Sequence, residues 1–156
     1  MSKNLYKPGY DFLKYYLENK YNLSITLKPF AEDAYYPNIN KIFINSNYHW
    51  RDRLITLIHE SGHVLLELED GLVKSMKSNT TAYTEVIRSR KQLISLLNEE
   101  ITAWNLGKNL ASDLNIRFDQ SRLDEVSTNC ILSYIKSGLT DVYGKTIDVS
   151  QIYINT

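Results

Sequence analysis

Hydrophobic side chains recur every three or four residues in four stretches of the chain, which is the spacing of an amphipathic α-helix. The stretches are residues 9–21, 51–68, 83–114 and 118–139. The third is longer than an ordinary helix, so we expect it to break before about Lys91. The pattern therefore predicts an N-terminal helix, two central helices and a further C-terminal helix.

Residues typical of helix ends stand next to these stretches. Asn22, Gly71 and Gly138 lie where three of the helices should end, because Asn and Gly are favoured at helix C-termini. Ser121 and Asp124 have the spacing of a capping box, in which side chains satisfy the first N–H groups of a helix. We expect the last helix to begin near this pair and to run to Gly138.

The hydrophobic period changes from about 3.6 to 2 between the first two helices. SITLKPF (24–30) alternates apolar and polar residues, KIFIN (41–45) is a short β-branched and aromatic run, and a short strand is expected over Ala34–Tyr36. These segments predict a small antiparallel sheet. GLVKSMKSNTT (71–81) is polar and rich in turn residues, and the tail TIDVSQIYIN (146–155) is expected to form an edge strand or an ordered extension.

Length and composition favour one domain and exclude several kinds of partner. The 156 residues match one α+β domain spanning 1–156. Lys plus Arg equals Asp plus Glu at 18 each, which argues against nucleic acid or an anionic membrane and for a protein or peptide partner. With one cysteine, no apolar secretion signal and no apolar run near about 20 residues, we expect a cytosolic protein.

LIHESGHVLLE (57–67) contains two of the three histidines of the chain. Residues four apart share one face of a helix, so the imidazoles of His59 and His63 can converge on one metal ion, and a tetrahedral zinc fits that geometry. Glu60 is rotated by roughly 100° about the helix axis, which places it near a metal-bound water as a base and not as a ligand.

An accidental pattern on an amphipathic helix is the alternative interpretation of this motif. Two imidazoles and a carboxylate in the buried stripe of a helix are costly unless they are hydrogen-bonded or coordinated. Coordination would satisfy all three groups, which favours a metal site.

The third ligand must come from elsewhere in the chain, because no histidine follows His63. Glu67 continues the histidine face, but eight residues of helix rise about 12 Å, which is too far from His59, and we expect a solvated helix end there. Glu100 shares a face with apolar and small residues, whereas Glu99 has polar neighbours. Glu100 is therefore expected to point inward and to bind the metal, although a snorkelling charge is the alternative.

The sequence resembles the gluzincin-type metallopeptidases, and within them the small ImmA/IrrE-like family of phages and mobile elements. The resemblance rests on HESGH at 59–63, on EITAW at 100–104, and on the order of helix, short sheet, HExxH helix and glutamate helix. It covers about residues 10–115, the expected core of a zincin-like domain, and leaves 116–156 as a C-terminal helical extension. Trp104 is a departure, because larger gluzincins carry an acidic residue at that position.

The resemblance implies zinc held by His59, His63 and Glu100, with Glu60 as the general base of peptide-bond hydrolysis. Zinc lowers the pKa of its bound water to about 7, so that Glu60 can accept the proton and return it to the leaving amine. Some relatives cleave a helix-turn-helix repressor, and the resemblance extends to such a substrate only by analogy. The expected function is a zinc endopeptidase acting on one or a few cytosolic proteins.

Several further expectations accompany this function. The oxyanion donor is sought among His49, Tyr48, Tyr83 and Tyr134, none of which has an informative spacing. KIFIN (41–45) is either an edge strand that pairs with an extended substrate or an ordinary inner strand.

Trp50 and Trp104 are expected in the core, and Cys130 is expected to be a buried small hydrophobe. The alternative function is a binding or regulatory module of the same fold, with a structural metal and no proteolysis. Glu60 favours the enzyme, because a structural site has no use for a base beside an open coordination position.

Overall fold

The computed structural model describes residues 4–69 and 87–144, and in these residues four α-helices accompany one three-stranded sheet. The expected α+β class is confirmed. The polar segment 71–81, Tyr83 and the tail 146–155 lie outside the described residues. In chain order the elements are α1 (Lys7–Tyr21), β1 (Ser24–Lys28), β2 (Ala34–Tyr36), the 3-10 helix η1 (Pro37–Ile39), β3 (Lys41–Asn45), α2 (Trp50–Glu69), α3 (Arg90–Asp113) and α4 (Gln120–Tyr143).

Helix α1 begins two residues before the predicted start and ends where predicted. Pro8 lies in its first turn, where a residue without an N–H is tolerated because no intrahelical partner exists for that group. Asn22 ends the helix in the left-handed conformation, with φ of 54°. Leu13 and Leu17 are completely buried. The N-terminal helix is thus an amphipathic helix that covers the core, as its spacing predicts.

The sheet is mixed, so the prediction of an antiparallel sheet is wrong. The strand order is β1-β3-β2, with β1 parallel to β3 and β2 antiparallel to β3. Strand β3 lies between the other two, since Ile42 pairs with Ile25 on one side and Tyr35 on the other, and Ile42 and Ile44 are fully buried there. KIFIN is therefore the inner strand, and β1 and β2 are the two edge strands of the described sheet.

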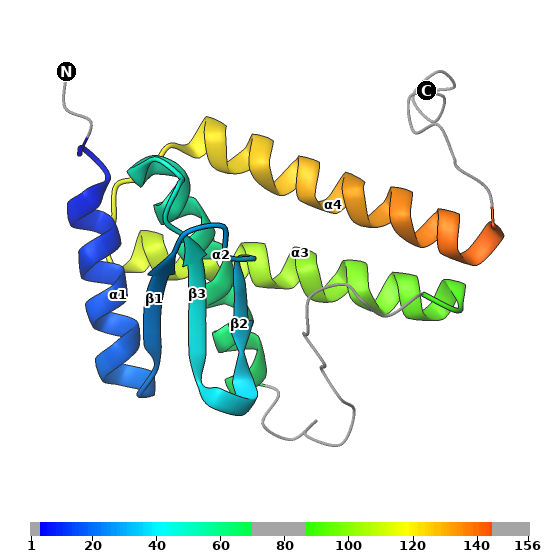
Figure 1. Cartoon of the computed structure of the whole chain (residues 1–156), viewed down its shortest axis with the longest axis horizontal. Helices are drawn as coiled ribbons and strands as arrows, with labels where there is room; N and C mark the ends of the chain where they lie inside the picture. Colours follow the sequence, from blue (N-terminus) through cyan, green and yellow to red (C-terminus); the bar gives the residue numbers. More distant parts are fainter. Residues whose placement is uncertain (1–3, 70–86, 145–156) are drawn as a thin grey trace.

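Helix α2 lies behind the sheet in the view of Figure 1 and contacts β2, β3, α1 and α3. It extends the predicted range 51–68 by one residue at each end. Leu54, Leu57 and Ile58 are completely buried, which is the expected result for the apolar stripe of an amphipathic helix. This helix places the histidine motif in the interior, close to the sheet.

Helices α3 and α4 run side by side in opposite directions, and one end of the pair extends beyond the sheet (Figure 1). The predicted break before Lys91 is confirmed, because α3 starts at Arg90 and Ser89 caps it by accepting a hydrogen bond from Gln92 N. Trp104, on α3, is buried with a relative exposure of 6% and joins the core, as expected.

The start of α4 is predicted to within one residue, but the capping box and the end at Gly138 are wrong. The helix starts at Gln120, so Asp119 is its cap and accepts a hydrogen bond from Arg122 N at 3.0 Å, while Ser121 is already helical. The helix continues past Gly138 and ends at Gly144, which has φ of 64°. A Cβ atom at position 138 would lie 2.3 Å from Leu93 Cδ1, so Gly138 serves close packing of α3 and α4 and not termination.

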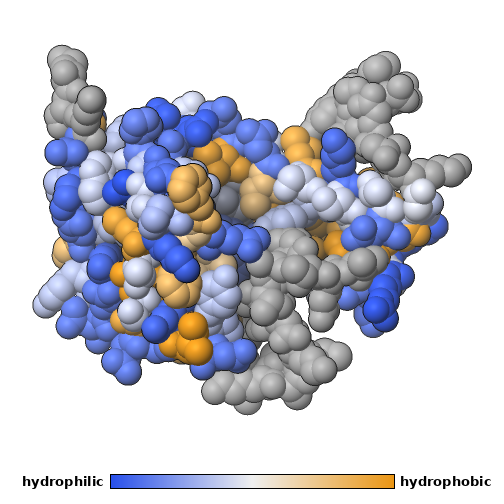
Figure 2. All heavy atoms as spheres, in the orientation of Figure 1, coloured by the Kyte–Doolittle hydropathy of each residue, from blue (hydrophilic) through white to orange (hydrophobic). Residues whose placement is uncertain are grey.

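The face of the molecule drawn in Figure 2 is mostly hydrophilic over the described residues. Hydrophobic side chains form separate patches on the face drawn in Figure 2. None of the helices in residues 4–69 and 87–144 combines the length and the apolar character needed to cross a membrane.

Candidate metal centre

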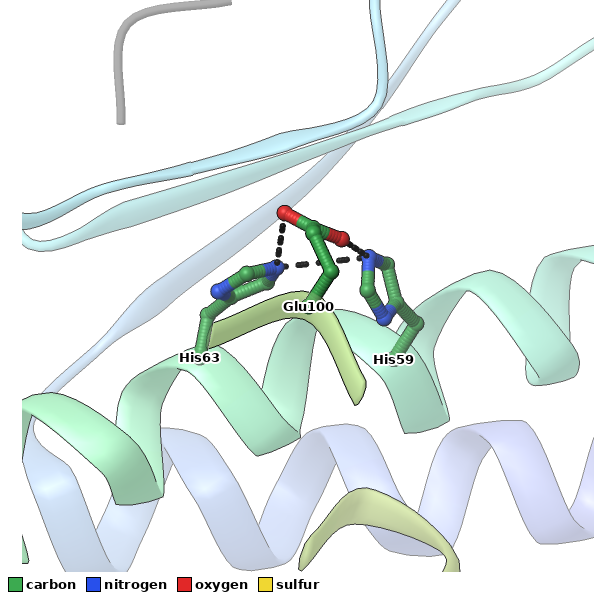
Figure 3. Close-up of side chains that lie close together, drawn as sticks. All are labelled: His59, His63 and Glu100. Atoms are coloured by element: carbon green, nitrogen blue, oxygen red, sulfur yellow. Dashed lines mark hydrogen bonds and ion pairs between the residues drawn. The ribbon is translucent and has the colours of Figure 1, made fainter. Parts of the chain in front are cut away.

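His59 and His63 lie on one buried face of α2, four residues apart. Their relative exposures are 8% and 9%, so both rings belong to the interior. The two Nε2 atoms are 3.3 Å apart, and the ring planes are inclined by 75° (Figure 3). The helical repeat thus directs two nitrogen donors to one point, as the i, i+4 spacing predicts.

Glu100 reaches the same point from α3 (Figure 3). One carboxylate oxygen, Oε2, is 3.4 Å from His59 Nε2, and the other, Oε1, is 3.4 Å from His63 Nε2. Glu100 is buried at 4% relative exposure, whereas Glu99 is half-buried. The choice of Glu100 over Glu99 as the inward residue is therefore confirmed.

Three small residues allow α2 and α3 to approach closely enough for this meeting. A Cβ atom at Gly62 would lie 1.7 Å from the carbonyl oxygen of Ala103, and one at Gly107 would lie 1.9 Å from that of Ile58. No side chain fits at either distance. Ala103 and Gly107 are among the small residues on the face of α3 that carries Glu100, whereas Gly62 lies inside the histidine motif itself.

His59, His63 and Glu100 can hold a metal ion, since one donor atom from each lies within 4.8 Å of the others. Ligands bound at 2.0–2.1 Å in a tetrahedral site stand about 3.3 Å apart. The two Nε2 atoms are 3.3 Å apart, close to that edge length, and each lies 3.4 Å from a different oxygen of Glu100. Two imidazoles and one carboxylate from two helices form a compact donor triangle.

Burial and mutual attraction shift the pKa values of this group in opposite directions. Burial lowers the pKa of His63, but its hydrogen bond to Glu100 and the charge of Glu60 outweigh burial and raise it to about 9. Burial raises the pKa of Glu100, but hydrogen bonds from His59 and His63 outweigh burial and lower it to about 2. In the metal-free protein, a proton on His63 supplies the positive charge that the Glu100 carboxylate attracts.

Glu60 is buried beside the two histidines, at 5% relative exposure. Burial raises its pKa, the charges of His59 and His63 lower it, and those of Glu100 and Asp33 raise it. Its position on the helix differs by about 100° from that of His59, and it is not part of the donor triangle. A carboxylate in such surroundings accepts a proton more readily than one in water.

Asp33 is a member of the site that the sequence did not reveal. Its carboxylate accepts a hydrogen bond from Asn45 N at 2.7 Å, and a hydrogen bond from Tyr48 lowers its pKa, although burial raises that pKa by more. Its charge acts on both His59 and Glu60. It precedes β2 in a turn-rich segment, and no spacing connects it with the histidines.

The candidate oxyanion donors fall at different places. His49 is exposed, one residue before α2 and ten residues, or about 15 Å of helix rise, from His59. Tyr48 is 39% exposed and lies beside Asp33. Tyr83 is outside the described residues. Tyr48 and Tyr134 each have a neighbour that interacts with the centre: Asp33 for Tyr48, and Cys130 for Tyr134.

Helix α4 also reaches the surroundings of the centre, through Cys130 and Tyr134. Cys130 is half-buried against the core and not fully buried as expected. Burial raises the pKa of its thiol, the charges of Glu100 and Glu60 raise it further, and an interaction with Tyr134 lowers it.

Two more side chains depart from their expected roles. Trp104 belongs to the core, but its indole also stacks on the His59 ring, with centroids 4.0 Å apart and planes inclined by 19°. Glu67 is half-buried, so the expectation of a solvated helix end is wrong. Burial raises the pKa of Tyr35, and a hydrogen bond with Glu67 raises it further, because the two side chains meet between β2 and α2.

Comparison with known proteins does not assign the chain to a family: no protein-family model, no curated protein and no solved structure matches it. The donor triangle and its surroundings are therefore the observations on which a function has to rest.

Proposed function

We propose that this protein is a zinc-dependent endopeptidase of the gluzincin type, similar to the ImmA/IrrE-like family, with a zincin-like fold. The observation that carries the proposal is the buried triangle of His59, His63 and Glu100 with the buried carboxylate of Glu60 next to it. Three protein ligands leave a coordination position open, which is the pattern of catalytic and not of structural zinc.

Zinc is the metal that we propose for this donor set. Two imidazole nitrogens and a carboxylate group, gathered around one point, suit zinc better than the all-oxygen cations calcium or magnesium. When bound, zinc would lower the pKa of a water molecule and polarise the carbonyl group of a substrate.

The remaining steps of the proposed reaction are assigned to side chains of the protein. Glu60 takes a proton from the attacking water and returns it to the leaving amine, and its raised pKa suits it to both steps. Asp33, held by Asn45 and Tyr48, adds negative charge beside His59 and Glu60. The Tyr48 hydroxyl donates to Asp33, so it can donate to a developing oxyanion only by exchanging that partner.

The proposed substrate is a peptide segment of one or a few cytosolic proteins, and a helix-turn-helix repressor is the example suggested by the resemblance. Strand β3 is paired on both sides and cannot accept a substrate strand. Strand β2 pairs on one side only among the described strands, contacts α2 and directly follows Asp33. We propose that an extended substrate adds to this edge of β2.

Metal binding is the first test of the proposal. Purified wild-type protein should contain about one zinc ion per chain, and His59→Ala should contain none. Glu100→Gln should lose most of its zinc, whereas the adjacent Glu99→Gln serves as the matched control and should retain it. Wild type without zinc, or zinc retained by both His59→Ala and Glu100→Gln, would contradict the metal centre.

Cleavage is the second test, and it separates the enzyme from a binding module with a structural metal. Glu60→Gln should keep the metal but produce none of the new protein termini that appear in cells expressing wild type. Glu67→Gln, on the same helix, is the control and should leave those termini unchanged. Identical sets of termini from wild type and Glu60→Gln would remove Glu60 as the base.

A further inference from the structure

Trp104 on α3 stacks against His59, one of the proposed metal ligands on α2. Trp104 lies four residues after Glu100, so both side chains face α2. Its indole is parallel to the His59 imidazole to within 19°, at a centroid distance of 4.0 Å. The relative exposure of Trp104 is 6%, so solvent does not compete for this stacked position.

The orientation of a ligand imidazole has to be fixed by some contact. Rotation about the bond between Cβ and the ring is soft, because such torsions have broad minima. Metal-binding histidines commonly solve this by donating a hydrogen bond from the second ring nitrogen to a carboxylate or a carbonyl group. In the part of the chain that is described, Nδ1 of His59 is buried and has no hydrogen-bond partner. The usual restraint is therefore not provided by these residues.

We propose that Trp104 is the positioning residue of His59: its indole face holds the imidazole so that Nε2 points toward His63 and Glu100. This inference rests on the proposed metal centre. Stacking blocks rotation of the imidazole because any large turn would drive the ring edge into the indole. Binding of a cation withdraws electrons from the imidazole, which strengthens its attraction to the electron-rich indole face.

Trp104 is itself held in place by its neighbours. It belongs to the hydrophobic core, and Cys130 on α4 packs against that core and interacts with the indole. The next turn of α3 is fixed against α2 by Gly107, where no side chain fits. The indole is thus a rigid surface, and a rigid surface can define the orientation of the ring that stacks on it.

Zinc affinity of purified protein, measured by competition with a chelating dye, tests the inference without any substrate. Trp104→Leu keeps an apolar side chain but removes the aromatic face, and should weaken zinc binding about 10–100-fold, as loss of an orienting contact does. Trp104→Phe restores a flat ring and should recover most of that loss. Trp50→Leu is the matched control, because Trp50 stands at the start of α2 against Tyr10, and should bind zinc like wild type.

Wild-type affinity in Trp104→Leu, or an equal loss in Trp104→Phe, would overturn the inference. A measurement on wild type covers the case in which a variant fails to fold. In metal-free protein, NMR should show the ring protons of His59 displaced upfield by the indole, and Trp50→Leu should leave that displacement intact. Ring protons of His59 at ordinary chemical shifts would also overturn it.

These outcomes separate the inference from the proposed function. Zinc binding and stacking as described, with no cleavage by wild type, would contradict the peptidase and leave the role of Trp104 standing. Cleavage by wild type, together with unchanged zinc affinity in Trp104→Leu, would support the peptidase and contradict the role of Trp104. A wild-type protein that binds no zinc would overturn both.

Discussion

Replacement of Gly62 by alanine should destroy the metal centre without touching any ligand. The added Cβ atom would lie 1.7 Å from the carbonyl oxygen of Ala103, whereas real Cβ atoms essentially never approach closer than 3.0 Å. Helices α2 and α3 must then move apart locally by at least about 1.3 Å, because both atoms belong to rigid helical backbone. Glu100 is one turn before Ala103 and moves with it.

The displacement is large compared with what a metal site tolerates. Coordination requires the carboxylate oxygen to lie about 2.0–2.2 Å from the ion, so a shift of more than 1 Å removes Glu100 as a ligand. We expect zinc affinity to fall by more than about 100-fold. Overpacking should also cost about 1–3 kcal/mol of stability, partly offset by about 1 kcal/mol because alanine is a better helix former than glycine.

Chelator competition measures the affinity, and urea unfolding of the metal-free protein measures the stability. Gly138→Ala is the control: its Cβ would meet the end of the Leu93 side chain, which can rotate away, and it lies outside the donor triangle. That variant should bind zinc like wild type. The reasoning is refuted if Gly62→Ala folds and also binds zinc as tightly as wild type.

Three further predictions follow from local features. In the metal-free protein the His63–Glu100 pair contributes its full stability between about pH 4.5 and 6.5. This contribution is lost as pH rises through about 9, the raised pKa of His63, and as pH falls toward about 2, the lowered pKa of Glu100. Thermal unfolding measured across that pH range checks both limits. Removal of zinc by a chelator should lower stability by about 2.7 kcal/mol relative to protein held at a hundred times the dissociation constant, as calorimetry would show. Asp119→Ala should cost about 1 kcal/mol in urea unfolding and Ser121→Ala much less, because Asp119 accepts the capping hydrogen bond of α4; equal costs would contradict that assignment.

The sequence predicted the helices, the strands and the inward glutamate, but not every detail of how these elements end and pair. All four helices appear where the 3.6-residue period places them, and the three strands appear where the period falls to 2 or a short strand was expected. Inward placement of Glu100 also followed from periodicity, because a helix face is a local property. Predictions failed at sheet pairing and at the C-terminal end of α4, where residues distant in the chain decide between similar local choices.

The sequence by itself determined which residues can act as donors: two histidines four apart with a glutamate between them, and a second glutamate on an apolar face. The tertiary structure decided how close these donors come, through the missing side chains of Gly62 and Gly107. It also brought Asp33 and Trp104 to His59. The physical reason is that spacing along a helix fixes directions within that helix, whereas contacts between elements depend on how their surfaces pack.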